Sequence, residues 1–387
     1  MIVNLSSSQI GAPQLAGVAG ALKGVLKAAL VDGFGASGIT SIDVAAGVAT
    51  ATFAAAHPYR VGTMVAVSGA VPAQLNGVAR VLSASALSIS FATTAVDGAA
   101  STPGAAKVAP AGWQELFSGA NLTALKPAVP EATGCVLRVD DTGTSTTARV
   151  RAYESMTDIN TGVGPMPLDS QVSGGVYWPK SASADATARP WIVVADERGV
   201  HVAVDPAGAG RYSVWYAGDI ASLKSGDAWS WLLCGNVDGA VNTSNIMTCC
   251  NGYSGRSARA GAYMARAYTG LGGSLGVGRV GMGQNGSAAD AYSGTANYSM
   301  AGGGPNGANN GLMLTPVELI EAGVRGTIPG LYHARSAWVA NYFSTGVVVA
   351  GTDDLSGRSL MAISVAPPIG STTPGVVFID LTGPWAR

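Results

Sequence analysis

The sequence predicts a mainly β, multi-domain protein in which an N-terminal helix precedes a small β-barrel or sandwich module and larger antiparallel β domains. Three observations support this fold class. Apolar and polar residues alternate in many short runs, which is the period of a strand with one buried face. Glycine supplies 54 of 387 residues, about twice its usual ~7%, without the three-residue period of collagen. Glycine, proline, serine and aspartate cluster between the apolar runs, where turns are required.

The first element in chain order is a helix. The apolar residues of 14–31 recur at steps of three and four, which predicts one buried stripe. That stripe consists of Leu15, Val18, Leu22, Val25, Leu26 and Ala29. Ser6–Ser8 offer N-caps, Pro13 suits the first turn, and Gly33 can end the helix. We expect segment 1–38 either to pack on its own domain or to dock the subunit on its neighbours.

The next segment, 39–108, is expected to form the small β-barrel or sandwich module. Its predicted strands are Val48–Phe53, Met64–Val67, Val78–Leu82 and Leu87–Phe91. His57 falls in a turn between two of these strands, so we interpret it as a turn residue and not as a ligand. Ala99–Pro110 is rich in alanine, glycine, serine and proline, which is typical of a linker.

The central β domain is expected over residues 109–240. Cys135–Asp140 and Ala148–Tyr153 both alternate in polarity around the turn Asp141–Gly143, which predicts a hairpin. Further strands are predicted at Trp191–Val194, His201–Val204, Tyr212–Tyr216 and Trp229–Cys234. The tryptophans concentrated here are Trp178, Trp191, Trp215, Trp229 and Trp231. We interpret them as sheet core, with a sugar-stacking platform as the alternative.

The final segment, 241–387, combines a glycine-rich loop region with a C-terminal β domain. Asn242–Asn310 is dense in glycine, serine, asparagine, alanine and tyrosine. Adaptable binding surfaces share this composition, so we expect assembly contacts here. Leu314–Val324 is interpreted as a short helical turn. Closing strands are predicted at Val347–Ala350, Leu360–Val365 and Val376–Leu381.

The charge content bears on partners and location. Charged residues make up 12% of the chain, with a net charge of −1, against a usual charged share of ~25%. Lysine and arginine form no basic cluster, so we expect no nucleic-acid partner. A surface with few charges also favours contact with other proteins. Lys23 and Lys27 interrupt the apolar stretch 14–31 and no secretion signal is recognised, so we expect no membrane anchor.

No motif predicts catalysis, so we expect no enzyme and assign no catalytic, cofactor-binding or metal-binding residue. Gly276–Gly281 matches GxGxxG formally, but the Met-Gly-Gln-Asn-Gly that follows should not start a helix. The histidines, His57, His201 and His333, lack the spacing of a zinc site. The cysteines, Cys135, Cys234, Cys249 and Cys250, follow no metal spacing either and are interpreted as inert thiols of a reducing cytoplasm.

Two pairs of adjacent acids are candidates for catalytic carboxylates. Neighbouring residues of a strand point to opposite faces, so neither Asp140-Asp141 nor Asp353-Asp354 forms a glycosidase couple by itself. We interpret both pairs as turn acids or polar strand ends. A calcium ion near Asp140, Asp141 or Asp158 is a weak alternative, because the ligand ladder of an EF-hand is missing.

Several strings resemble a family of structural proteins encoded among the virion genes of tailed bacteriophages, and the resemblance runs through most of the chain. The longer strings are Arg138–Thr144 (RVDDTGT), Ala148–Val150, Tyr153–Pro165, Gln171–Gly175 and Tyr177–Ser181 (YWPKS). The shorter ones are Ala109–Trp113, Phe117–Gly119, Pro329–His333 and Phe378–Trp385. In addition, His57–Gly77 is similar to a β-module frequent in phage tail proteins, with Pro58 in place of the usual glycine.

The resemblance implies a structural component of a virion, in the tail or in the tail tip and baseplate. Such a protein is made in the host cytoplasm and assembles with copies of itself and with other tail proteins. The alternatives are a host receptor-binding adhesin of the tail tip, which grips a cell-surface glycan or pilus, and a head decoration protein. A polysaccharide hydrolase is the weakest hypothesis, because candidate acids are few.

Overall fold

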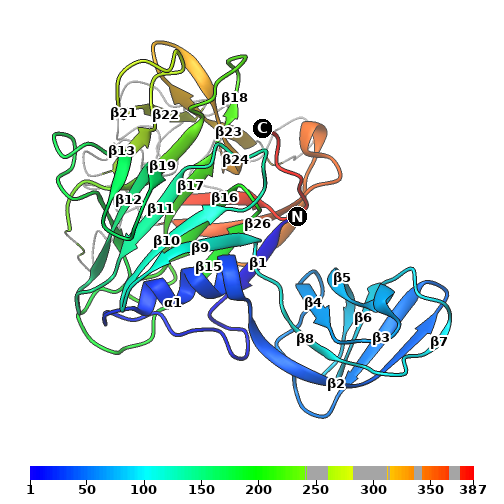
Figure 1. Cartoon of the computed structure of the whole chain (residues 1–387). Helices are drawn as coiled ribbons and strands as arrows, with labels where there is room; N and C mark the ends of the chain where they lie inside the picture. The colour runs from blue at the N-terminus through cyan, green and yellow to red at the C-terminus, as the bar shows by residue number, and fades with distance from the viewer. Residues whose placement is uncertain (240, 242–259, 282–311, 313, 335–341, 366–374) are drawn as a thin grey trace.

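The computed structural model describes residues 1–387 except 240, 242–259, 282–311, 313, 335–341 and 366–374. It is mainly β, with 49% strand and 6% helix. The described residues form a closed six-stranded barrel beside a larger body of two antiparallel sheets (Figure 1). The predicted fold class is therefore confirmed.

The barrel lies between Phe34 and Val108. Its strands are β2 (Phe34–Ala45), β3 (Val48–Phe53), β4 (Met64–Ser68), β5 (Gly77–Ala84), β6 (Ser88–Ala92), β7 (Gly98–Ala99) and β8 (Ala105–Val108), with a short 3-10 turn at Ala73–Leu75. The order β3-β6-β5-β4-β8-β2 closes on itself because β3 also pairs with β2. The four strands predicted for this segment are confirmed.

The prediction of a linker at Ala99–Pro110 is wrong. Ala105–Val108 is strand β8, which pairs with β2 on one side and with β4 on the other. The side chains of Ala106 and Val108 are buried inside the barrel. Composition misled here because small residues suit a crowded barrel interior as well as they suit a flexible connection.

The larger sheet of the body contains thirteen strands. In spatial order they are β1 (Val3–Ser6), β15 (Trp191–Ala195), β16 (Gly199–Val204), β17 (Ser213–Asp219), β19 (Trp231–Asn236), β14 (Val176–Pro179), β12 (Thr147–Met156), β11 (Val136–Asp140), β10 (Leu122–Pro127) and β9 (Trp113–Ser118), with β13 (Gly162–Met166), β20 (Ala260–Met264) and β21 (Leu275–Gly276) off this path. The predicted hairpin is β11 with β12, in a register that places Val136 opposite Tyr153.

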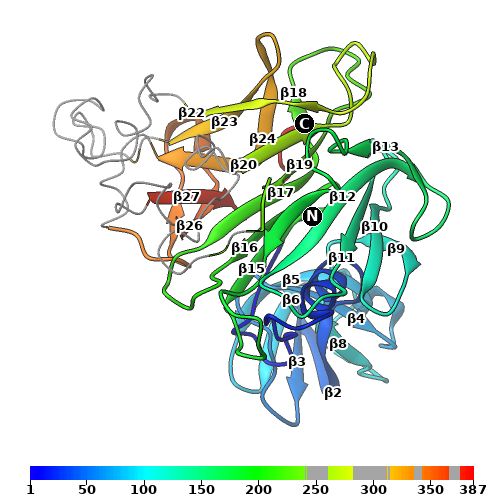
Figure 2. The ribbon, with the colours of Figure 1, turned by 90° about the vertical axis from the view of Figure 1, so that its left-hand side faces the viewer.

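The second sheet packs against the first. It contains β22 (Gly278–Gly281), β23 (Leu314–Ile320), β24 (Val324–Ala334), β27 (Gly375–Asp380), β26 (Ser359–Val365), β25 (Val348–Ala350) and β18 (Ala221–Ser222). Figure 2 shows β26 and β27 alongside β16 and β17, and Tyr212 donates its N–H to the carbonyl of Ser364 across the two sheets at 2.8 Å. Strands from both sides of residue 240 contribute to each sheet.

The helical turn predicted at Leu314–Val324 is wrong, because β23 occupies most of that range. Thr315, Val317 and Leu319 are buried at every second position. This is the period of a strand, and the pairing of β23 with β22 and β24 satisfies its backbone. The three closing strands predicted after it are confirmed as β25, β26 and β27.

The N-terminal helix is shorter than predicted. Helix α1 spans Ala21–Lys27 and continues as a π-helical turn over Ala28–Asp32, which ends at Gly33. Ser6 belongs to strand β1, and Gly20, with φ of 78°, occupies the N-cap position instead. The apolar face of α1 is buried in the chain's own core, so this face is not available to dock a neighbour.

Candidate functional site

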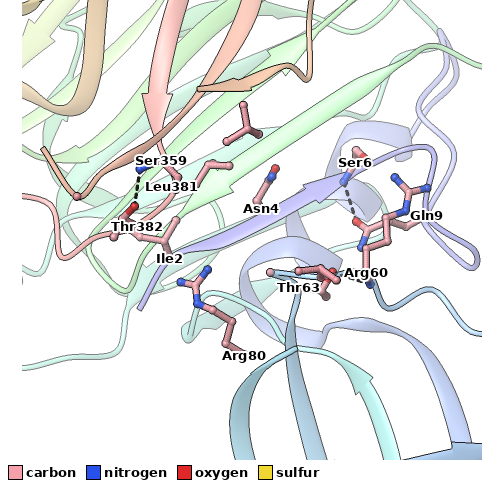
Figure 3. A pocket seen from close by; sticks show the side chains of 14 residues that line it. Ile2, Asn4, Ser6, Gln9, Arg60, Thr63, Arg80, Ser359, Leu381 and Thr382 are labelled. Carbon is pink, nitrogen blue, oxygen red and sulfur yellow. Dashed lines mark hydrogen bonds between the residues drawn. The ribbon is translucent and has the colours of Figure 1, made fainter. Parts of the chain in front are cut away.

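A cleft of about 630 Å³ lies between the barrel and the body (Figure 3). Its walls come from β1 and the turn after it, from the β3–β4 loop and β5 of the barrel, and from the ends of strands in the second sheet. The lining residues are Ile2, Asn4, Ser6, Gln9, Arg60, Val61, Gly62, Thr63, Arg80, Val348, Gly357, Ser359, Leu381 and Thr382. Pockets at domain junctions are frequent ligand sites, so this cleft is the candidate functional site.

Local hydrogen bonds shape the wall beside β1. The N–H of Ser6 donates to Oε1 of Gln9 at 2.9 Å, and the N–H of Gln9 donates to the carbonyl of Ser6 at 3.2 Å. On the barrel side, Nη2 of Arg60 donates to the carbonyl of Ser8 at 2.9 Å. These contacts hold the Arg60 side chain close to the end of β1.

The lining is positive and free of acids. Arg60 and Arg80 are exposed, and neither forms an ion pair within the part of the chain that the structure describes. The fourteen lining residues include no aspartate, glutamate, histidine, cysteine or aromatic residue. The cleft therefore offers hydrogen-bond donors and positive charge for binding, but no general acid or base.

Sequence reasoning did not find this site. Arg60 belongs to the module His57–Gly77, yet nothing along the chain indicates that it faces residues 2–9. Arg80 was likewise a single charge on a predicted strand. Only the placement of the barrel against β1 brings these residues together.

The three histidines lie apart from the cleft lining and from one another. His57 lies in the β3–β4 loop and packs between Phe53 and Tyr59, with ring centroids 4.7 and 5.1 Å away. Nε2 of His201 lies 2.8 Å from the carbonyl oxygen of Pro329. Burial lowers the pKa of His201 and of His333 to about 4. Among the described residues, no group of three His, Cys, Asp or Glu side chains is placed to hold a metal ion.

Acidification is expected to destabilise the fold through these two buried histidines. The unfolded chain takes up a proton at each near pH 6.5, whereas the folded chain takes it up only near pH 4. The contribution of each histidine to the free energy of unfolding is therefore fully present above pH 6.5. It is lost as the pH drops toward 4, which costs about 3 kcal/mol for each histidine. Urea unfolding at several pH values measures the slope of the unfolding free energy against pH. The substitution His201→Gln should reduce this slope by the equivalent of one proton. An unchanged slope in that variant would contradict the assignment.

The members of the two acid pairs lie in different surroundings. The carboxylate of Asp140 accepts from the hydroxyl of Thr142 at 2.7 Å, while Asp141 is buried. Asp353 and Asp354 are exposed in the 3-10 turn Asp353–Leu355. Asp158, the third candidate for calcium, is exposed in a turn.

The structure describes the glycine motif and two of the four cysteines. Gly278–Gly281 form strand β22, where a dinucleotide motif requires a turn into a helix. Cys135 and Cys234 are buried thiols, and burial raises the pKa of Cys135 to about 12. A thiol with so high a pKa is a poor nucleophile at neutral pH. Cys249, Cys250 and most of the stretch Asn242–Asn310 lie outside the described residues.

Four of the five tryptophans of the central region are fully buried, and the fifth packs against the core. Trp178, Trp191, Trp215 and Trp231 are at most 1% exposed. Trp229 is partly buried, and the guanidinium of Arg266 lies 4.2 Å from its ring centroid. The interpretation of these residues as sheet core is confirmed.

Two of the strings that carry the resemblance meet in a buried ion pair, which we name the helix junction. The Nζ of Lys180 donates to Oδ1 of Asp141 and, at 2.7 Å, to the carbonyl of Val18. The other carboxylate oxygen of Asp141 accepts from the N–H of Leu22 at 2.7 Å, at the start of α1. Burial raises the pKa of Asp141, against the opposing effect of Lys180. The helix is thus capped by a residue more than a hundred positions away.

A second buried cluster, the terminal junction, holds the last residue of the chain. Arg387 donates to both carboxylate oxygens of Asp196, at 2.5 and 2.9 Å. Nε of Arg387 also donates to the carbonyl of Asp219, whose carboxylate accepts from Arg198 at 2.9 Å. The hydroxyl of Thr133 donates to the same carboxylate at 2.6 Å. Four distant segments are joined in this way.

A third cluster, the sheet junction, links the two sheets. Arg325 on β24 has no exposed side-chain surface and donates to both carboxylate oxygens of Asp227, at 2.8 and 2.9 Å. It also donates to Glu321 at 2.6 Å and to the carbonyls of Arg266 and Trp229 at 2.6 and 3.0 Å. Asp227 lies between β18 and β19, so the guanidinium fastens the second sheet to the loop that enters the first.

Two further strings of the resemblance, Pro329–His333 and Phe378–Trp385, are in contact near His201. Gly330 adopts φ of 67°, and a Cβ at this position would lie 2.3 Å from Nε1 of Trp385. The Trp385 ring packs edge-on against His201, with centroids 5.1 Å apart. Leu331 and Tyr332 pair with Ile379 and Phe378. The glycine is required both for its left-handed backbone and for this close approach.

Comparison with known proteins adds no family. No protein-family model matches the chain, and no curated protein matches it significantly.

Proposed function

We propose that the chain is a structural subunit that acts by protein–protein assembly, in the tail or tail tip of a tailed-phage virion. The proposal is supported by the structural role of residues in the strings that resemble phage structural proteins. Asp141, Lys180, Gly330 and Trp385 all belong to them, and all join distant segments inside the fold. Residues that fix a rigid shape are what a repeated building unit requires, since each copy must present the same surface to its neighbours.

The exposed apolar residues support protein contacts as the mode of action. Fifteen large apolar side chains are exposed among the described residues, and six of them lie on the barrel. These six are Val61, Val71, Val78, Leu82, Leu87 and Val96. The barrel holds less than a quarter of the described residues, so this concentration supports the barrel as a surface that meets other protein.

The test is to purify infectious particles, separate their proteins and identify this chain by mass spectrometry. We expect it in the mature particle at a fixed copy number, with antibody labelling on the tail. Labelling on the head would indicate a decoration protein instead. Saturable binding of the purified chain to host cells would favour the adhesin. Absence from particles, with the chain left soluble in the lysate, would refute the structural role.

A further inference from the structure

We propose that the cleft binds an extended acidic peptide segment of a neighbouring protein, added as a strand to the open edge of β1. The carboxylates of that segment would meet Arg60 and Arg80. This inference deepens the proposed assembly function and rests on it for the identity of the partner. It assigns the contact to a defined set of residues at the junction of the barrel and the body.

The backbone of β1 has one edge that no other described strand covers, since β1 ends its sheet and pairs only with β15. Ser7 donates its N–H to the carbonyl of Trp191 at 3.0 Å. In an antiparallel pair, alternate residues direct their backbone groups toward and away from the partner strand. The backbone N–H and C=O groups of Val3 and Leu5 therefore point toward β15, while those of Asn4 and Ser6 point away from it.

Gln9 closes only part of this edge. Its side-chain oxygen and backbone N–H satisfy the two outward groups of Ser6. No described residue hydrogen-bonds to the outward backbone N–H and carbonyl of Asn4. Figure 3 shows Thr63 and Arg80 on the barrel side of this strand, facing the cleft. An unpaired strand edge that borders a cleft is the setting for strand addition by a peptide.

The charge of the cleft selects an acidic occupant. Two exposed guanidinium groups face a lining without any carboxylate. A guanidinium recognises a carboxylate by paired, charge-assisted hydrogen bonds. Arg60 is already positioned by the carbonyl of Ser8, so less side-chain entropy is lost when it binds.

The lining favours a peptide over a saccharide. Sugars commonly stack on aromatic rings, and none of the fourteen lining residues is aromatic. β1 has four residues, which at about 3.3 Å each match an extended segment of similar length. Such a contact is small and weak by itself, but repetition in a symmetric particle strengthens it.

The first experiment uses the intact particle. A photo-crosslinking amino acid replaces Val61, which lines the cleft, or Val96, which is exposed outside it. We expect position 61 to capture a segment rich in aspartate and glutamate, and position 96 not to capture that segment. If particles contain the chain and position 61 yields no adduct, or one with a neutral or basic segment, the cleft proposal is wrong while the assembly function stands.

The second experiment uses the purified full-length chain and a fluorescent oligoglutamate peptide, with oligolysine and the acidic saccharide oligogalacturonate as the comparisons. We expect oligoglutamate to bind more tightly, and Arg60→Gln or Arg80→Gln to weaken it at least tenfold. Arg211→Gln removes the same charge from an exposed site outside the cleft and should change binding little. No preference for oligoglutamate, or stronger binding of oligogalacturonate, would overturn the proposal whether or not the chain is found in particles.

Discussion

Replacing Lys180 by methionine is expected to lower the free energy of unfolding by about 3–5 kcal/mol. The Lys180 side chain has no exposed surface, and its loss leaves the carboxylate of Asp141 buried without a cation. The carbonyl of Val18 loses its shorter hydrogen bond as well and keeps only the N–H of Ala21, at 3.4 Å. Urea unfolding of the wild type and the variant measures the difference.

The matched control for this change is Lys27→Met. Lys27 pairs with Glu115 at a position where about a third of the lysine side chain is exposed, and such pairs contribute roughly 1 kcal/mol or less. The double variant Asp141→Asn with Lys180→Met should recover part of the loss, because it removes the uncompensated charge. A Lys180→Met protein as stable as the Lys27→Met protein would show that the helix junction is not important for stability.

Replacing Arg325 by methionine is expected to cost a similar amount, about 3–5 kcal/mol. The change leaves Asp227, which is 1% exposed, without its bidentate partner, and it removes the donors to two backbone carbonyls. Because Arg325 links the two sheets, we also expect the substitution to accelerate amide exchange in β18 and β24 more than it does in the barrel strands. Hydrogen exchange and urea unfolding measure these two effects.

Arg325→Lys separates charge from geometry at this position. Lysine retains the positive charge but lacks the planar fork that meets five acceptors, so less than half of the lost stability should return. Arg60→Met is the matched control, because Arg60 is exposed and forms no ion pair among the described residues. If Arg325→Met destabilises no more than Arg60→Met, the sheet junction does not fasten the sheets.

Many strands with one buried face were predictable from the sequence. In the hairpin of β11 and β12, the period of two locates both strands and even their buried faces, since Ala148, Val150 and Ala152 are all in the core. The failures have a common cause, which is that long-range contacts override local composition. The start of α1 is set by Asp141, and β23 is set by its pairing with β22 and β24.

The candidate site could not be predicted in the same way. Its residues come from the first ten positions, from two parts of the barrel and from the last fifty positions. The spacing of these residues along the chain does not indicate that they lie together in the fold. The buried ions were equally hidden, because a single lysine in YWPKS and a single arginine in β24 look like surface charges until burial is known.

The connection between the barrel and the body has a consequence for how this chain can change. Phe34 pairs with Val108, and the N–H groups of Ala111 and Gly112 donate to the carbonyls of Ala29 and Leu30. The chain therefore leaves the body and returns to it at nearly one point. An insertion with coincident entry and exit can be exchanged for another module without rebuilding its host. Recombination at this point would replace the barrel and its exposed surface while preserving the fold of the body.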